Sequence, residues 1–484
     1  MAANFTPLIS YMKSAFQRWA ALPLSPLGRI NRVKMNILPK FLYLFQSIPL
    51  FLPKSFFKNT DKLILSFIWA GKTPRVKKFS LQRSRLSGGL ALPNFMYYYW
   101  AANIQKLVLW VQAPSLPWCH LEAQSCISIS LPALVFSSLP IALSQYTDNP
   151  VVCTSLKIFY QFRRHFKSIS ASTMAPICNN HLFPPSFMDS TFSLWEKKGL
   201  KCLEDLFINN VLANFSELSS SFSLPPSHLL RFFQIRHCVS SLFVGFPSLP
   251  TKSAWEEVFK LNPHKRGIIS QIYATIWSQD DSYNIKIVGA WEEELGLELE
   301  DDYWGRALDN IRTTTSCARL SFIQFKVVHR AHLSRSRLSK IYPNVPDMCE
   351  NCKLSACNLS HMFVLCPKLQ TFWNSFFGTM SDILKIKLDL CPLIAIFGVS
   401  SQCQPLNHEQ ASVVAFASLL ARHRILLSWT SPQPPSISVW LRGLMFFLKL
   451  EKIKYNIRGR GDSFLGKWQQ FIIYFNDLHT LEVD

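Results

Sequence analysis

Apolar residues recur three and four positions apart along much of this 484-residue chain. The clearest example follows Pro53, where one such series is formed by Phe56, Phe57, Thr60, Leu63, Ile64, Phe67 and Ile68. This spacing places side chains on one face of a helix, and proline suits a helix's first turn. Similar series run from about residue 16 to 110 between turns marked by proline and glycine. The pattern predicts a mainly α fold.

Changes in composition divide the chain into segments. Residues 1–111 form a basic helical segment, and residues 112–150, rich in Ser and Pro without strong periodicity, suggest a connector. Helical patterns resume over 151–345, and a helical tail covers 379–484 with a proline-rich break at 431–436. The remaining segment, 346–378, contains a cysteine cluster. With 49% hydrophobic residues, the chain can bury substantial cores.

Positive charge is concentrated near the N-terminus. The chain has 51 Lys and Arg against 30 Asp and Glu, a net charge of +21, and residues 1–110 hold 16 of these cations and one acid, Asp61. Lys54, Lys58 and Lys62, here called the lysine stripe, recur on a second face of the helix after Pro53. Like charges at this spacing repel one another slightly, so the stripe is either a solvated face or a site for an external polyanion.

The cysteines and the apolar runs bear on the compartment. Thirteen cysteines are scattered through the chain, and residues 1–16 lack the pattern of a signal peptide. The uncharged run 123–147 contains Pro132 and Pro140, and the apolar run 411–421 ends at Arg422. We therefore expect a protein without structural disulfides or a membrane span, located in the cytoplasm, the nucleus or both.

One local motif has the spacing of a metal site: Cys349-x2-Cys352-x8-His361-x4-Cys366. Two thiolates two residues apart can hold one ion from a tight turn, and a histidine and a third thiolate would close a tetrahedral site. This donor set predicts structural Zn²⁺ in a zinc-knuckle-like module at 346–378. Pro367 would suit the first turn of a following helix.

Cys357 is a fifth potential ligand, because it lies where a shorter knuckle would have its histidine. The alternative to a metal site is a group of buried thiols and a core histidine. The residues just upstream, 311–346, contain no acid and seven cations: Arg312, Arg319, Lys326, Arg330, Arg335, Arg337 and Lys340. A basic run beside a small metal module is typical of backbone contacts to nucleic acid, although an ordinary basic surface helix has the same composition.

Sequence signatures of catalysis are missing. Two-metal nucleotidyl transfer needs carboxylates fixed on adjacent strands. The acidic pairs Asp280-Asp281 and Asp301-Asp302 lack the preceding aromatic residue of a polymerase hairpin and lie in polar helical sequence. The chain also has no phosphate-binding loop, nucleophile elbow or dinucleotide fingerprint. We therefore expect no enzymatic activity and no small-molecule substrate.

Several segments, in order, resemble the reverse transcriptase polyprotein encoded by the second open reading frame of LINE-type non-LTR retrotransposons. They are WAALPLSPLGRINRVKMNILPK at 19–40, LYLFQ at 42–46, FIWAGK at 67–72, GGLALP at 88–93, YYWAA at 98–102 and QFKVVHR at 324–330. The Cys/His motif, Trp429, Leu450-Glu-Lys452 and Trp468 are also similar to that family's C-terminal region. The resemblance is dense at 15–110 and 320–375 and looser elsewhere.

This resemblance implies a helical thumb-like domain at 1–111, followed by a C-terminal region that binds RNA and contains the zinc module. It assigns the ligands to Cys349, Cys352, His361 and Cys366, with Cys357 as an extra residue. In the family, an endonuclease and the polymerase palm precede these segments, so the resemblance predicts a non-catalytic remnant that binds RNA or an RNA/DNA duplex. The expected backbone contacts are Arg29, Arg32, Lys34, Lys54, Lys58, Lys62, Lys326, Arg330, Arg335 and Arg337.

Two other hypotheses remain open from the sequence. The chain could be a host interaction or scaffold protein that kept the helical fold without RNA binding. It could also be an incomplete gene product of a full reverse transcriptase. The oligomeric state has no signature in the sequence.

Overall fold

The computed structural model of the chain describes residues 2–253, 255–278, 283–354, 356–400, 406–429, 431 and 433–481. Helices account for 64% of the residues and strands for 2%, which confirms the predicted mainly α fold. The chain forms two compact units. The first unit comprises residues 1–13, 36–61 and 94–281, and the second comprises residues 14–35, 62–93 and 282–484. The helix expected after Pro53 is α4 (Lys54–Ile68), whose Phe57, Thr60 and Ile64 are buried.

The first unit is built around α6 (Phe95–Gln112), which Asn94 caps by accepting a hydrogen bond from the Tyr97 amide. Most of this helix is buried. It packs against α3, α9 and α14, and the indole of Trp100 donates to Gln161 on α9 at 3.0 Å. The other helices that lie wholly in this unit are α3 (Leu38–Ser47), α7 (Pro117–Gln124), α8 (Leu131–Phe136), α9 (Pro150–His165), α10 (Pro185–Met188), α11 (Thr191–Lys197), α12 (Phe215–Phe222), α13 (Leu229–Leu242) and α14 (Ile268–Ser278).

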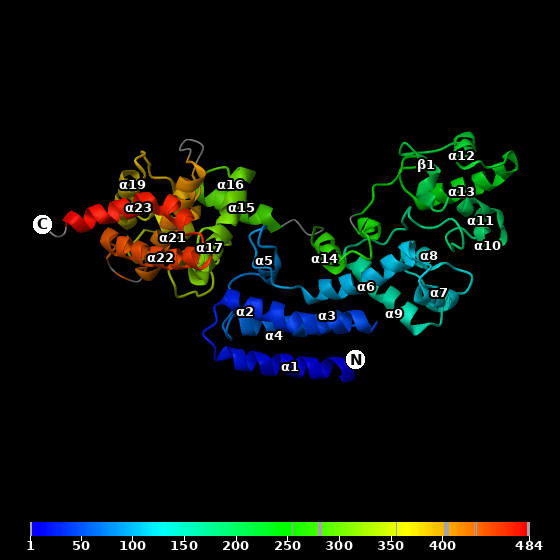
Figure 1. Cartoon of the computed structure of the whole chain (residues 1–484), viewed down its shortest axis with the longest axis horizontal. Coiled ribbons are helices and arrows are strands. Elements are labelled where there is room, and N and C mark those ends of the chain that lie inside the picture. The colour runs from blue at the N-terminus through cyan, green and yellow to red at the C-terminus, as the bar shows by residue number, and fades with distance from the viewer. Residues whose placement is uncertain are drawn as a thin grey trace. The chain divides into compact units, whose positions relative to one another are not determined.

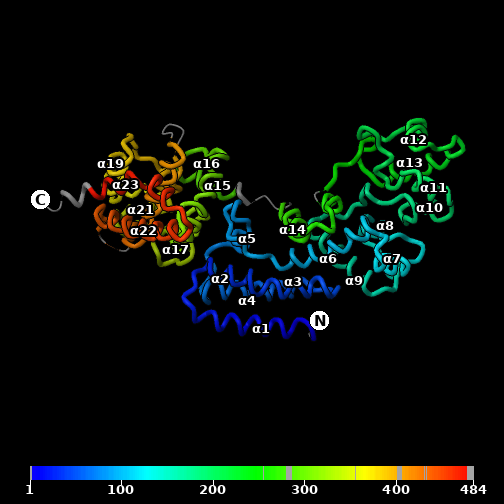
Figure 2. Tube along the Cα trace, in the orientation of Figure 1, coloured from blue at the N-terminus to red at the C-terminus, as the bar shows by residue number. Residues whose placement is uncertain are grey.

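The first unit also contains a two-stranded hairpin, β1 (Phe207–Ile208) and β2 (Val211–Leu212), in which Ile208 pairs with Val211. The two residues between the strands, Asn209 and Asn210, both have positive φ, the conformation that a tight two-residue hairpin turn requires. Figure 2 shows the chain path through this region and the neighbouring α12 and α13. Short 3-10 turns join several elements: Leu143–Gln145, Leu203–Leu206, Pro226–His228 and Glu256–Lys260.

The second unit is organised around α21 (His408–Leu427), which is buried on every side from Val413 to His423. A helix without a solvent-facing side must be enclosed by other helices, and α17, α20, α22 and α23 pack against it (Figure 1). The helices that lie wholly in this unit are α2 (Pro26–Arg32), α5 (Lys78–Gln82), α15 (Tyr283–Leu295), α16 (Asp301–Thr313), α17 (Ala318–Val328), α18 (Arg335–Ser339), α19 (Pro367–Leu384), α20 (Pro392–Phe397), α22 (Ile437–Ile457) and α23 (Gly461–Leu481).

Helices α1 (Ala2–Ala20) and α4 contribute residues to both units, as does a π-helical turn, Val33–Ile37. A second π-helical turn, η6 (His361–Leu365), precedes α19 and forms part of the site described below. Within the described part of the chain, no helix is long and apolar enough to cross a membrane.

Candidate metal centre

The four residues of the predicted metal motif lie together in the second unit. The donor atoms of Cys349, Cys352, His361 and Cys366, here called the Cys/His cluster, all lie within 4.8 Å of one another. The sulfurs of Cys349 and Cys366 are 4.0 Å apart, and the Cys352 sulfur is 3.3 Å from the His361 Nε2. Two thiolates on one tetrahedral Zn²⁺ would be about 3.7 Å apart, given Zn–S bonds of about 2.3 Å. The spacing of the cluster therefore fits a single metal ion.

A tight turn presents the first two thiols. The amide of Cys349 donates to the Leu354 carbonyl at 2.8 Å, and the amide of Lys353 donates back to the Cys349 carbonyl at 2.9 Å. Lys353 has a φ of 61°, a left-handed conformation that lets the chain reverse within this short segment. The two sulfurs thus lie on one side of a closed loop, which is what a thiolate pair needs in order to bind one ion.

Two helical elements present the other ligands. His361 begins η6, and its amide donates to the side-chain oxygen of Asn358 at 2.9 Å. Cys366 ends that turn and is the N-cap residue of α19, whose first residue is Pro367. The predicted helix after Cys366 is therefore present, and it buries Phe372, Trp373 and Phe376.

The thiols differ in their electrostatic surroundings. Burial alone would raise the pKa of the Cys349 thiol. Hydrogen bonds with the amides of Cys352 and Asn351 and with the neighbouring thiols outweigh this effect, so the net pKa is lowered. Burial and the charge of Cys349 raise the pKa of Cys366 to about 12. Burial also lowers the pKa of His361, which favours the neutral imidazole that a metal requires. A bound cation would stabilise the thiolate forms of all three cysteines.

Cys357, the fifth potential ligand, is not part of the group of four. Its thiol is fully buried, and burial, together with the charge of Cys349, raises its pKa to about 12. Its backbone is held in place: the amide donates to Asp347 at 3.0 Å, and the carbonyl accepts from the Ser336 amide at 3.1 Å. Asp347 also accepts from the Ser336 hydroxyl at 2.6 Å.

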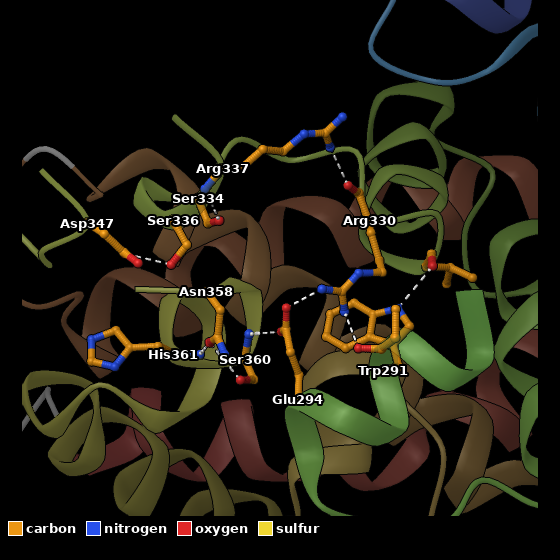
Figure 3. A network of polar contacts seen from close by, with 12 residues as sticks. Trp291, Glu294, Arg330, Ser334, Ser336, Arg337, Asp347, Asn358, Ser360 and His361 are labelled. Atoms are coloured by element: carbon orange, nitrogen blue, oxygen red, sulfur yellow. Dashed lines mark hydrogen bonds and ion pairs between the residues drawn. The ribbon is translucent and has the colours of Figure 1, made fainter. Parts of the chain in front are cut away.

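A polar network supports the cluster from the side of α15 (Figure 3). Glu294 forms an ion pair with Arg330 and accepts a hydrogen bond from the Ser360 amide at 3.1 Å. The Arg330 guanidinium lies 4.6 Å from the centre of the buried Trp291 ring. The Ser360 hydroxyl donates at 2.8 Å to the side chain of Asn358, which also accepts from the His361 amide. This network therefore fixes the backbone just before His361. Hydrogen-bonded supports of this kind orient ligands in metal sites.

The four cations of the basic run that are expected to contact a nucleic-acid backbone have different surroundings. Arg337 is exposed, although its Nη1 donates to the Arg330 carbonyl at 2.7 Å. Arg335 pairs with Glu350, and Arg330 belongs to the network above. Lys326 is half-buried, with its ammonium 5.5 Å from the Phe322 ring centre. Of these four cations, only Arg337 presents an exposed side chain.

The expected contacts nearer the N-terminus also divide into exposed and internal cations. All three residues of the lysine stripe are exposed along α4. Arg32, at the end of α2, is also exposed. Arg29 is buried and donates to the Phe67 carbonyl at 2.6 Å. Lys34 is half-buried, and its pKa is lowered by burial and by the nearby Arg85. The roles of Arg29 and Arg330 in the fold were not foreseen from the sequence, because their partners lie far away along the chain.

One of the two acidic pairs is described by the structure. Asp301 and Asp302 are exposed in the first turn of α16, and Asp302 pairs with Arg306 at 3.0 Å, as solvated helix residues do. Asp280-Asp281 lies outside the described residues. The sequence signals missed Glu294 and Asp347, which support the cluster although neither belongs to a recognisable motif. No known family model matches the chain.

Proposed function

We propose that this chain is a non-catalytic protein that binds RNA or an RNA/DNA duplex and is stabilised by one structural Zn²⁺ in the Cys/His cluster. The observation that carries the proposal is the convergence of the four donor atoms within 4.8 Å of one another. Three sulfurs and one imidazole nitrogen suit Zn²⁺ better than harder ions. When bound, the ion would cross-link the loop at 349–352 to the start of α19.

The positive charge supports the nucleic-acid part of the proposal. The chain carries a net charge of +21, and the exposed Arg337, Lys340 and Lys353 lie close to the cluster ligands in the sequence. The lysine stripe offers three more exposed cations on one helix. Contacts of this kind neutralise phosphates and do not read bases, so we expect modest sequence preference.

The surroundings of the carboxylates support a non-catalytic role. Asp302 is exposed and paired with Arg306, and Glu294 is engaged with Arg330 and Ser360. A metal-dependent transferase instead needs carboxylates that are fixed together and open to a substrate. The described residues thus suit binding better than catalysis.

The decisive experiment measures RNA binding against salt concentration. Fluorescence anisotropy with a labelled single-stranded RNA is expected to show an affinity that falls steeply as salt rises. In a triple variant of the lysine stripe, Lys54→Gln, Lys58→Gln and Lys62→Gln, the slope of log K against log salt should shrink by about 2, since each lost phosphate contact contributes about 0.7.

The matched control replaces three other exposed lysines, Lys201→Gln, Lys385→Gln and Lys387→Gln. It removes the same net charge and is expected to leave the slope nearly unchanged. An affinity that does not depend on salt, or wild-type protein that binds no RNA, would favour the scaffold hypothesis instead. Equal effects of both triple variants would show that the lysine stripe is only part of a diffuse basic surface.

A further inference from the structure

The second unit contains a groove that is separate from the Cys/His cluster. It lies between the loop preceding α2, one face of α17 and the C-terminal end of α21, and its volume is about 540 Å³. Its apolar wall includes Phe322, Leu426 and Leu427, and its polar wall includes Arg319 and Lys326. Pockets that hold nucleotides and other small ligands commonly measure roughly 300–1,000 Å³. The groove is therefore large enough for one nucleotide.

The charges around the groove are positive. None of its described lining residues is acidic, and within the described part of the chain Arg319 and Lys326 have no acidic partner. The pKa of Lys326 is lowered by burial and then by Arg75 and Arg319, so both arginines repel the Lys326 ammonium. Unpaired like charges raise the free energy of the empty groove, and an anion bound between them would relieve it. The same charges disfavour a metal ion.

Two histidines in the wall of the groove each have one ring nitrogen without a hydrogen-bond partner. His332 and His423 are 5% and 8% exposed, and the Nε2 of each is buried without a partner. Burial and the charges of Lys326 and Arg75 lower the pKa of His332 to about 3, although a hydrogen bond with the Ile323 backbone acts in the opposite direction. Burial, Arg319 and Arg424 lower the pKa of His423 to about 4. Unsatisfied buried polar atoms are uncommon in folded proteins, and a bound water, ion or ligand is one way in which they are satisfied.

We infer that this groove binds the phosphate group of a nucleotide, with Arg319 and Lys326 as the cations that hold the phosphate oxygens. The ring of Phe322 and the two leucines supply an apolar surface for the base or the sugar. The nucleotide is either free or one unit of an RNA strand, since both carry the same phosphate chemistry. The inference rests on the proposed nucleic-acid binding and names a specific site for it.

Protonation of the two histidines should be coupled to phosphate binding. In the empty groove both imidazoles are neutral at pH 7, and a bound anion favours their protonated forms and raises their pKa values. His332 faces Lys326, Arg75 and the ring of Phe363. His423 faces Arg319, Arg424 and the ring of Phe447. Phosphate binding is therefore expected to take up protons, and the affinity should rise as the pH falls through the raised pKa of the bound state toward the ligand-free values near 3 and 4.

The test is a calorimetric titration of the full chain with adenosine 5′-monophosphate, with adenosine as the phosphate-free comparison. Arg319→Gln with Lys326→Gln is expected to weaken binding of the monophosphate by tenfold or more, because two charge-assisted contacts are lost. Arg442→Gln with Lys387→Gln removes two exposed charges outside the groove and should leave binding unchanged. Circular dichroism melts check that both double variants remain folded.

Proton uptake gives a second readout. Titrations in two buffers with different ionisation enthalpies should show protons taken up by wild type, and the His332→Gln variant should lose part of that uptake. A 5′-phosphorylated trinucleotide that competes with the monophosphate would assign the groove to RNA, and one that does not compete would assign it to free nucleotides.

Three results would overturn the inference: no binding of the monophosphate, equal binding of adenosine, or an equal loss in the control double variant. RNA binding is measured in parallel, so that the two proposals can fail separately. If RNA binds but the monophosphate does not, the groove inference fails while the proposed function stands. If the monophosphate binds but RNA does not, the proposed function fails and the groove is a site for free nucleotides.

Discussion

The eight residues between Cys352 and His361 make the motif longer than a short knuckle, and hydrogen bonds of residues within this gap account for the position of His361. Cys357 lies inside the gap with its amide bound to Asp347 and its carbonyl bound to Ser336. The chain then reaches Asn358, which accepts from the His361 amide at the start of η6. Cys357 is thus held by its backbone, while His361 is oriented toward Cys352.

Metal stoichiometry tests this choice of ligand. We expect one zinc per wild-type chain by plasma mass spectrometry, loss of zinc in Cys349→Ser and His361→Ala, and retention in Cys357→Ser. The reason is geometric, since only the first two variants remove a donor of the cluster. Loss of zinc in Cys357→Ser together with retention in His361→Ala would reverse the assignment. Wild-type protein without metal would contradict the site itself.

Glu294 provides a second test at the level of single residues. Its carboxylate serves both Arg330 and the Ser360 amide, and its side chain is 15% exposed. Glu294→Gln keeps the size but removes the charge, so we expect a loss of about 1–3 kcal/mol in the free energy of unfolding and weaker zinc binding. Urea denaturation and competition with a chelator would measure the two effects.

The neighbouring Glu293 is exposed on the same helix and provides the matched control. Glu293→Gln should change stability by less than about 0.5 kcal/mol. Equal effects of the two substitutions would mean that the network around Glu294 does not support the cluster.

The sequence predicts the position of residues that lie close together along the chain, but not the contacts of residues whose partners lie far away along it. The four residues of the Cys/His cluster can be predicted from spacing because all of them lie within one short segment. For Arg330, in contrast, the sequence shows only its charge, which predicts a contact with a nucleic-acid backbone. Its partners Glu294 and Trp291 lie on α15, and only folding brings them together. Local spacing can suggest donor atoms, but it cannot show which cations are already paired.

At the scale of elements, local signals predicted helices better than turns. Pro53 and the apolar series predicted α4, and Pro367 predicted the start of α19. The hairpin at 207–212 was missed, although Asn209-Asn210 is a favourable pair for its turn. The short helices α7 and α8 lie in the segment interpreted as a connector. Segments this short give too few periods for an apolar pattern to be recognised.

The packing of α20 against α21 provides an element-level prediction. Gly398 ends α20 with a φ of 70°, and a Cβ there would lie 2.9 Å from the Ala415 Cα on α21. Gly398→Ala should therefore destabilise the second unit by about 1–3 kcal/mol through strain and overpacking. Thermal unfolding followed by circular dichroism would measure it.

Gly378, inside α19, is the contrasting position, because nothing lies within 4 Å of a Cβ placed there. Gly378→Ala should stabilise the protein by up to about 1 kcal/mol, since alanine is the better helix former. If both substitutions shift stability in the same direction, the close approach of α20 and α21 is not the cause.

For the whole molecule, the two compact units should respond differently to metal loss. The Cys/His cluster lies in the second unit, and the structural metal would cross-link a loop that has little secondary structure of its own. The helix that follows the cluster is secured independently of metal. Trp373 donates to the Phe363 carbonyl at 2.9 Å, and Phe376 contacts Trp440 on α22. Metal loss should therefore loosen one segment without unfolding the unit around it.

Hydrogen exchange before and after chelation tests this expectation. Removing zinc should speed amide exchange at residues 345–378, most strongly at the amides of Cys349 and Lys353, whose hydrogen bonds close the thiolate turn. The buried helix α6 of the first unit should exchange as before, because its packing does not involve the cluster. RNA affinity should fall without being abolished, since most of the exposed cations lie outside 345–378. Adding zinc back should restore slow exchange. A uniform increase of exchange across both units on chelation would show that the metal stabilises the whole chain. Unchanged exchange would show that the metal contributes nothing to folding.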